Sequence, residues 1–178
     1  MFVSEIIKNP PEEYSTRLQK LVYNALTVLE IPFERVDTGN AVTMEDCIEI
    51  DKKLNCKVVK TLFLCNRQKT SFYLFVTPGD KPFVTKNFGS ALDVSRVSFA
   101  PSEILLEKMN TEVGATTVFS LLLDSADDVR IVFDKEVLEN EYYGCTDGTY
   151  NCYMKVKTDD IINKLIPYTE HTLEIIEV

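Results

Sequence analysis

The sequence predicts an α+β protein, in which a mixed, curved β-sheet is surrounded by helices. Three observations lead to this class: short apolar runs of strand length, one apolar stripe with helical spacing near the N-terminus, and turn residues between these segments. A chain of 178 residues is long enough for one hydrophobic core, and it contains no internal repeat, low-complexity segment or linker. We therefore expect a single domain over residues 1–178, with a helical segment at about 10–31 and a sheet core at about 33–178.

The first helix is expected to begin at Pro10-Pro11, because proline is favoured in the first turn and the following acids suit its positive end. Ile31-Pro32 ends it. Between these limits, six apolar residues form one stripe that is expected to pack on the core: Leu18, Leu21, Val22, Ala25, Leu26 and Leu29.

A short strand over 33–36 and a turn cluster over 37–40 are expected next. Thr43 then caps a second helix, because its hydroxyl can accept a hydrogen bond from the free N–H groups of the first turn. The inner side of this helix is predicted to carry Met44, Cys47, Ile48 and Leu54.

The segment from Val58 to Cys65 is the central feature of the chain, because it is apolar on both faces and rich in residues that favour strands. Alternation places Lys60, Leu62 and Leu64 on one face of this strand and Thr61 and its alternate neighbours on the other. Lys60 is thus a cation among core residues, where an unpaired ammonium is costly. Three explanations are open: Lys60 lies at the solvent-exposed end of the strand, it pairs with an acid such as Glu49 or Asp51, or it has a function.

The rest of the chain alternates between short elements. An acidic turn follows residue 123; it lacks the glycine and distal glutamate of a calcium loop and is interpreted as a hairpin turn. The expected strands are 72–76, 83–84, 97–99, 118–123, 129–133, 142–143, 151–156 and 173–176, and the expected helical segments are 87–93, 101–109, 134–139 and 158–166.

Composition excludes several classes of protein. Hydrophobic content of 45% and charged content of 26% are ordinary for a soluble domain, and no apolar run approaches the roughly 18 residues of a membrane span. The N-terminus does not resemble a signal peptide, so a cytoplasmic protein is expected. The five cysteines form no C-x-x-C pair and are interpreted as buried reduced thiols, and with His171 as the only histidine we expect no metal site.

The net charge of −9 argues against broad binding to DNA, which requires a basic surface. A nucleic-acid-binding site would need local basic residues instead. The basic residues that lie near the central strand in sequence, and that would have to converge around such a site, are Lys52, Lys53, Lys57, Arg67, Lys69, Lys81 and Lys86.

Four blocks of the sequence resemble one known family in order and spacing. Lys60-Thr61-Leu62-Phe63-Leu64 is similar to its "K-N-L-F-L" strand, and Arg96-Val97-Ser98-Phe99-Ala100 is similar to its "R-L-S-F-A" segment. Gly114-Ala115-Thr116-Thr117-Val118 stands in the place of its G-x-x-x-P loop, and Ile131-Val132-Phe133-Asp134 resembles its "v-x-l-D" strand. The family is that of the YbaK/ProX-type editing domains, which remove wrong amino acids from tRNA.

The resemblance implies an aminoacyl-tRNA deacylase that acts on tRNA for proline carrying alanine or another small amino acid, with prolyl-tRNA synthetase as a further partner and without a cofactor. It implies that Lys60 is the catalytic residue and that the loop shapes the amino-acid pocket. The residues expected to bind the substrate are Gly114, Ala115, Thr116, Thr117, Val118, Phe99, Thr146 and Thr38.

The chain departs from the family pattern at three positions. Val118 replaces the usual proline of the loop, and Thr146 and Thr38 stand where many relatives carry histidine. Threonine cannot act as a base near neutral pH. The alternative hypothesis is therefore a catalytically weak or inactive module that binds aminoacyl-tRNA or a free amino acid, whereas a redox or metal protein built on the cysteines has little support.

Overall fold

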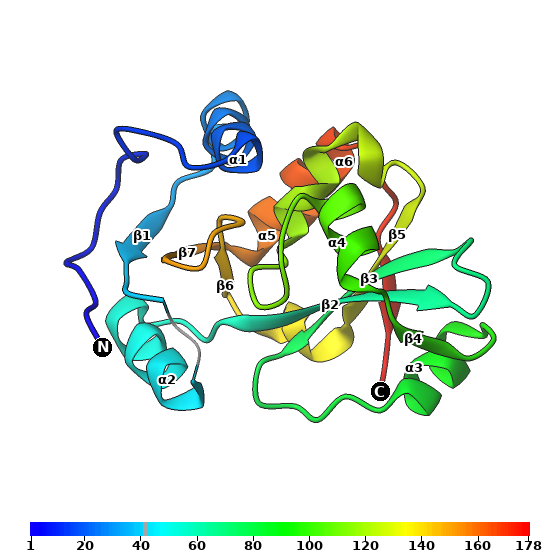
Figure 1. Ribbon diagram of the computed structural model, residues 1–178. Helices are drawn as coiled ribbons and strands as arrows, with labels where there is room; N and C mark the ends of the chain where they lie inside the picture. Colours follow the sequence, from blue (N-terminus) through cyan, green and yellow to red (C-terminus); the bar gives the residue numbers. More distant parts are fainter. Residues whose placement is uncertain (41–42) are drawn as a thin grey trace.

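Two β-sheets form the frame of this computed structural model, which describes residues 1–40 and 43–178 apart from the Met44 side chain (Figure 1). The predicted α+β class is confirmed, and the strands are divided between two sheets. The antiparallel three-stranded sheet has the order β1 (Glu34–Asp37), β7 (Cys152–Lys157), β6 (Tyr142–Thr146). The five-stranded sheet has the order β4 (Val97–Phe99), β2 (Val59–Asn66), β3 (Phe72–Pro78), β5 (Val129–Asp134), β8 (Glu174–Ile176).

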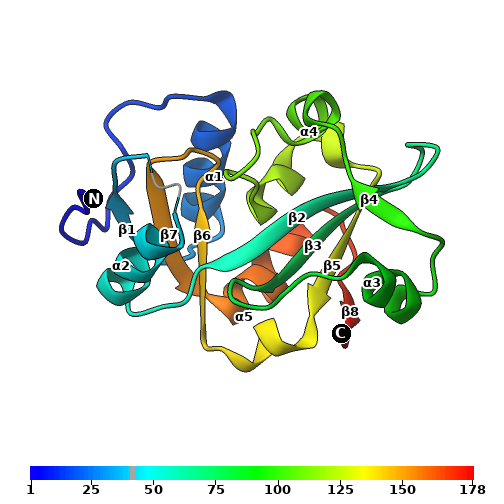
Figure 2. The same ribbon diagram turned by 60° about the horizontal axis from the view of Figure 1, so that its bottom comes forward.

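The five-stranded sheet is mixed, as predicted. Strand β2 pairs with β3 and with β4 in antiparallel orientation, whereas β5 is parallel to both β3 and β8. In Figures 1 and 2, β2 extends from the side of the three-stranded sheet into the middle of the larger sheet. Strand β2 therefore connects the two sheets.

Helices cover the sheets on several sides. The helical elements are α1 (Arg17–Val28), α2 (Met44–Leu54), α3 (Thr85–Leu92), α4 (Ser102–Met109), η1 (Val118–Leu122), η2 (Asp124–Ala126), η3 (Lys135–Glu139), α5 (Thr158–Asp160), η4 (Ile161–Leu165) and α6 (Ile166–Tyr168). Helices α3 and α4 lie on opposite faces of the five-stranded sheet (Figure 2). Among the described residues, no helix has the length and apolar character needed to cross a membrane.

Helix α1 begins at Arg17, so the predicted start at Pro10-Pro11 is wrong. The Thr16 hydroxyl accepts a hydrogen bond from the backbone N–H of Gln19 at 3.0 Å, and the Gln19 side chain accepts one from the N–H of Ser15 at 2.7 Å. This Thr-x-x-Gln arrangement satisfies free donors of the first turn better than the prolines do.

Helix α2 begins after Thr43, as predicted, and Thr43 and Asp46 form a reciprocal capping box. Its predicted inner face is only partly correct, because Leu54 is fully buried but Ile48 is 51% exposed. Ile50 is the buried residue that the pattern missed. The prediction for the Met44 side chain lies outside the part of the chain that the structure describes.

The two predicted strands that the structure contradicts are both apolar. Residues 118–123 contain the buried 3₁₀ helix η1, and the Thr117 hydroxyl caps it by accepting from the N–H of Phe119 at 3.4 Å. Residues 83–84 precede α3 and leave the sheet, since the Phe83 ring packs against three other aromatic rings. A short apolar run does not distinguish a strand from other buried segments. Consequently β5 does not pair with 118–123 in a hairpin; it is parallel to β3.

The two sheets touch where β2 begins. Val58 forms an isolated parallel bridge with Gly144 of β6. A Cβ atom at Gly144 would lie 2.8 Å from the carbonyl oxygen of Lys57, and one at Gly79 would lie 2.5 Å from that of Val58. Only glycine permits these approaches. Beyond this contact the sheets separate, and the candidate site lies between them.

Candidate active site at the free edge of strand β2

A cavity of about 410 Å³ lies along β2, between the two sheets. It is predominantly apolar and has few polar groups, which is typical of a small-molecule site. Its walls are formed by Cys47, Val58, Val59, Lys60, Thr61, Leu62, Phe63, Phe99, Ala100, Leu105, Val113, Gly114, Thr116, Cys145, Thr146 and Tyr153.

The edge of β2 that faces the cavity is unpaired at Thr61. Strand β4 pairs only with Leu64 to Asn66, and the bridge to the other sheet is at Val58. The Phe63 carbonyl accepts from the N–H of Ala100 at 3.0 Å, so the backbone of residue 63 points toward this edge. Backbone direction alternates along an antiparallel strand. The N–H and C=O of Thr61 therefore point the same way, and no strand in the described part of the chain pairs with them there.

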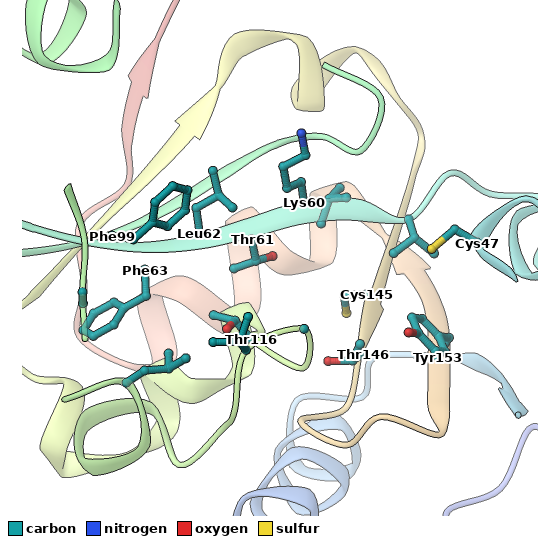
Figure 3. A pocket seen from close by; sticks show the side chains of 16 residues that line it. Cys47, Lys60, Thr61, Leu62, Phe63, Phe99, Thr116, Cys145, Thr146 and Tyr153 are labelled. Carbon is teal, nitrogen blue, oxygen red and sulfur yellow. The ribbon is translucent and has the colours of Figure 1, made fainter. Parts of the chain in front are cut away.

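Side chains on β2 alternate between two faces, as predicted. Lys60 and Leu62 project to one side of the strand, and Thr61 and Phe63 project to the other (Figure 3). The cavity reaches both sides, because it extends around the free edge of the strand. A ligand at this edge would thus contact Lys60 on one side and Thr61 on the other.

Lys60 is half-buried, and its ammonium donates a hydrogen bond to the backbone carbonyl of Lys81 at 2.6 Å. Within the described residues it forms no ion pair, so the suggested pairing with Glu49 or Asp51 is wrong. Asp51 instead accepts from the N–H of Val58 at 2.9 Å. The charge of Lys60 is therefore not neutralised by a carboxylate.

The loop that carries the Lys81 carbonyl is itself fixed. The Lys81 ammonium lies 2.9 Å from Asp134 and 2.8 Å from Glu136. Asp134 is only 1% exposed and also accepts a hydrogen bond from the Thr77 hydroxyl at 2.8 Å. This buried carboxylate anchors Lys81 and so holds the acceptor of Lys60 in place.

The glycine loop faces Thr61 across the cavity, where Gly114 and Thr116 line the wall. Gly114 has φ +96°, a backbone conformation that favours glycine. Ala115, Thr117 and Val118 are buried behind the wall and do not line it. The structure thus brings only part of the predicted loop into contact with the cavity.

Thr146 lines the cavity, but its hydroxyl is used within the protein. It donates to the Ala115 carbonyl at 3.0 Å, while the Thr117 hydroxyl donates to the Thr146 carbonyl at 2.9 Å. This reciprocal pair joins the loop to β6. Thr38 is 7% exposed, does not line the cavity, and donates to the carbonyl of Gly39 at 2.6 Å. Phe99 lines the rim and is 59% exposed.

The sequence analysis did not predict most of the lining residues as site residues, and three of these carry titratable side chains: Cys47, Cys145 and Tyr153. They come from α2, β6 and β7 and meet the cavity through long-range packing. Burial raises the pKa of Cys145 well above its usual value and also raises the pKa of Cys47. Burial raises the pKa of Tyr153 to about 12. All three groups are therefore protonated at neutral pH, and neither thiol has the thiolate character of a nucleophile.

Acid–base and metal chemistry have little support in this cavity. His171, the only histidine of the sequence, does not line the cavity. Its ring nitrogens form hydrogen bonds with the carbonyls of Thr169 and Ala126, at 2.9 Å each. The described residues contain no cluster of histidine, cysteine and acidic side chains able to hold a metal ion.

The thiols give a first prediction. We expect a thiol-specific reagent to label the folded protein slowly at neutral pH, with labelling of Cys47 and Cys145 accelerating only at alkaline pH, because burial raises both pKa values. Mass spectrometry after timed labelling measures this, and unfolded protein is the control in which all five cysteines react rapidly. Rapid labelling of one of the two at neutral pH would show that it is an activated thiol.

The suggested basic residues do not converge on the walls of the cavity. Of the seven suggested residues, none lines the cavity, and Lys53, Lys57 and Lys81 are held in ion pairs with acids. Arg67 lies at the opposite end of β2, in a separate groove. The cation at the cavity is Lys60.

Comparison with known proteins places this chain in a family. The family model for the aminoacyl-tRNA editing domain matches residues 38–164, and the chain belongs to this family. One relative is the prolyl-tRNA editing protein ProX of Acetoanaerobium sticklandii, which is 23% identical over 160 residues, covering 90% of this chain and 97% of the relative. Another is the prolyl-tRNA synthetase associated domain-containing protein 1 of Mus musculus, 29% identical over 116 residues, covering 64% of this chain and 68% of the relative.

A solved structure supports the fold. A protein provisionally named a trans-editing enzyme for prolyl tRNA synthetase superposes with a TM-score of 0.64, and the match covers 93% of this chain and 99% of the other. The sequences are 13% identical, so this likeness concerns the fold alone. The resemblance of the four sequence blocks to the editing-domain family is confirmed.

Proposed function

We propose that this protein is a trans-acting editing hydrolase that deacylates mischarged aminoacyl-tRNA, with alanine or another small amino acid on tRNA for proline as the substrate. The observation that carries the proposal is the cavity at the free edge of β2, which is lined by both Lys60 and Gly114. Figure 3 shows the side chains of Lys60 and Thr116, a neighbour of Gly114 in the loop, on opposite sides of the strand. The names of the relatives support tRNA for proline, and prolyl-tRNA synthetase is the corresponding protein partner. The proposal treats residues 1–178 as one editing domain.

The reaction adds water to the ester carbonyl. The bond between the carbonyl carbon and the ribose oxygen then breaks, the ribose oxygen takes a proton, and free amino acid and tRNA are released. The ester is already activated, so positioning and charge stabilisation supply most of what is needed. The substrate's own ribose hydroxyl assists the attacking water, in agreement with a cavity whose thiols and phenol stay protonated.

The backbone edge of β2 and the Lys60 side chain bind different parts of the substrate. The free N–H of Thr61 is a donor for the ester carbonyl, because it points into the cavity. The Lys60 ammonium, on the other side of the strand, binds the ribose or the last phosphate as a point charge. The amino-acid side chain enters the space between Phe63, Cys145 and Thr116.

Selectivity for a small amino acid follows from these walls. Phe63 and Cys145 are buried. The bonds from the Thr117 hydroxyl to the Thr146 carbonyl and from the Thr146 hydroxyl to the Ala115 carbonyl fix the loop, although Val118 replaces the family's proline. An extra methylene in such a pocket changes the binding free energy by about 1–3 kcal/mol. The pocket therefore discriminates between amino acids by the volume of their side chains, and the resulting selectivity is moderate.

A second candidate function, a binding module without catalysis, is favoured by one observation. The Thr146 hydroxyl, at the position where many relatives carry histidine, is engaged with the Ala115 carbonyl and with the N–H of Gly148 at 3.3 Å. Its one proton is thus committed to the Ala115 carbonyl, so this hydroxyl does not donate to the substrate. Such a module would use the same cavity to bind the aminoacyl end of tRNA and release it unchanged.

Deacylation assays separate the two functions. Purified protein is incubated with tRNA for proline charged with alanine, cysteine, serine or proline, and the remaining ester is measured over time. We expect loss of the alanyl ester above the rate without protein and preservation of the prolyl ester. Tight binding of alanyl-tRNA with no acceleration for any ester would contradict the enzyme and support the binding module.

A further inference from the structure

A second hollow lies at the far end of β2, outside the cavity described above. This groove has a volume of about 670 Å³. Its lining residues come from the turn after β2 and from the segment that leads into and includes β4: Arg67, Gln68, Ser95, Arg96, Val97 and Ser98.

Two arginines line this groove, next to the last residue pair of β2 and β4. The antiparallel register of β2 and β4 ends with Asn66 opposite Val97, and the next position on each side is Arg67 and Arg96. Both side chains are exposed. Two like charges that line one groove repel each other. A bound anion would remove this repulsion.

No carboxylate compensates the pair. Among the described residues, the acid nearest to Arg96 in sequence, Asp93, does not line the groove, and no ion pair of the described part of the chain includes Arg67 or Arg96. In contrast, most of the lysines and arginines elsewhere in this chain, whose net charge is −9, contact an acid. The groove is therefore a local basic surface on an acidic protein.

The groove leads to the cavity along β4, the edge strand of the sheet. Ser98 lines the groove, and the next two residues, Phe99 and Ala100, line the cavity. From Arg96 to Phe99 the strand covers about 10 Å, which is the length of about three stacked nucleotides. Phe99 is 59% exposed at the rim, where an aromatic ring can stack with a base.

From these observations we propose that the Arg67–Arg96 groove binds the phosphate backbone of the substrate tRNA, a few nucleotides before the aminoacylated end that enters the cavity. The inference rests on the proposed function, because it takes the substrate to be aminoacyl-tRNA. The arginines contact phosphates and not bases, so they contribute affinity for RNA without selecting a sequence. The exposed Phe99 ring then stacks with a base near the 3′ end.

The test compares the wild type with two double variants. R67E/R96E reverses the charge of the groove, and K20E/K157E makes the same change at two exposed lysines that have no ion pair in the described part of the chain and line neither the groove nor the cavity. Steady-state deacylation of alanyl-tRNA is measured at several salt concentrations. We expect KM to rise at least about tenfold in R67E/R96E with kcat nearly unchanged, because phosphate contacts supply affinity.

The salt dependence provides a second readout. Loss of two phosphate contacts should make the slope of log(kcat/KM) against log[salt] shallower by about 1.4, at about 0.7 for each contact with single-stranded RNA. The alanyl ester of adenosine, which is too short to reach the groove, should be hydrolysed equally by all three proteins. Equal KM and equal salt slopes for R67E/R96E and K20E/K157E would overturn the proposal.

The groove can be tested even if the proposed function fails. Should the wild type hydrolyse no ester, fluorescence anisotropy with labelled uncharged tRNA replaces the kinetic assay. Weaker binding by R67E/R96E than by K20E/K157E would still support an RNA surface at the groove. Equal binding by the two variants would contradict it.

Discussion

Replacing Lys60 with alanine is expected to lower kcat/KM for deacylation of alanyl-tRNA by about 10²–10³-fold, the usual effect of removing one group that stabilises charge in the transition state. The half-buried Lys60 ammonium is the cation of the cavity, and the described part of the chain offers it a backbone carbonyl but no carboxylate. A ligand phosphate or ribose oxygen can therefore take its hydrogen bonds. Alanine keeps the strand and removes this charge.

The matched control is Lys57→Ala. Lys57 lies three residues earlier, its side chain is 76% exposed, and it pairs with Asp80 on the surface, so its loss should change the rate less than about twofold. Lys60→Ala also removes the bond to the Lys81 carbonyl, and a thermal melt of each variant checks the fold. Equal rates in Lys60→Ala and wild type, with a lowered melting temperature, would show that Lys60 is a structural residue that fixes the 79–84 loop.

Local signals in the sequence were sufficient for much of the fold. The alternation around Lys60, the cap at Thr43 and the last strand near 174–176 depend on neighbours close in the chain, and each was predicted. Pairing between segments that are distant in the sequence could not be predicted from such local signals. The run 118–123 is as apolar as a strand, and only its packing among buried residues and the Thr117 cap make it a 3₁₀ helix.

The candidate site, like the fold, was predicted where the signal is local in the sequence and missed where it depends on distant segments. The apolar run predicted the strand with Lys60, and the family resemblance predicted the role of Lys60 and the loop with Gly114, because these are continuous motifs. It did not predict that Thr61 lies at an unpaired edge, which depends on where β4 ends. Nor did it predict the contributions of Cys47 and Tyr153, since these residues reach the cavity from separate elements.

Asp147→Ala is expected to cause the largest loss of stability. Asp147 is fully buried in the turn between β6 and β7, directly after Thr146. Its carboxylate accepts hydrogen bonds from the Gln19 amide at 2.9 Å and the Tyr23 hydroxyl at 2.8 Å, both on α1, and from the Thr149 hydroxyl at 2.6 Å. Burial raises the pKa of Tyr23 far above its ordinary value, so the phenol remains a donor at every relevant pH.

Alanine at position 147 leaves these buried donors without an acceptor, and we expect the free energy of unfolding to fall by about 3 kcal/mol. Urea denaturation measures it as a lower midpoint with an unchanged slope. Asp127→Ala, at an exposed aspartate, should change stability by less than about 0.5 kcal/mol. Asp147→Asn keeps the shape and part of the acceptor capacity, so it should fall between the two. If Asp147→Ala unfolded at the same urea concentration as Asp127→Ala, the carboxylate would not be what holds α1 against the β6–β7 turn.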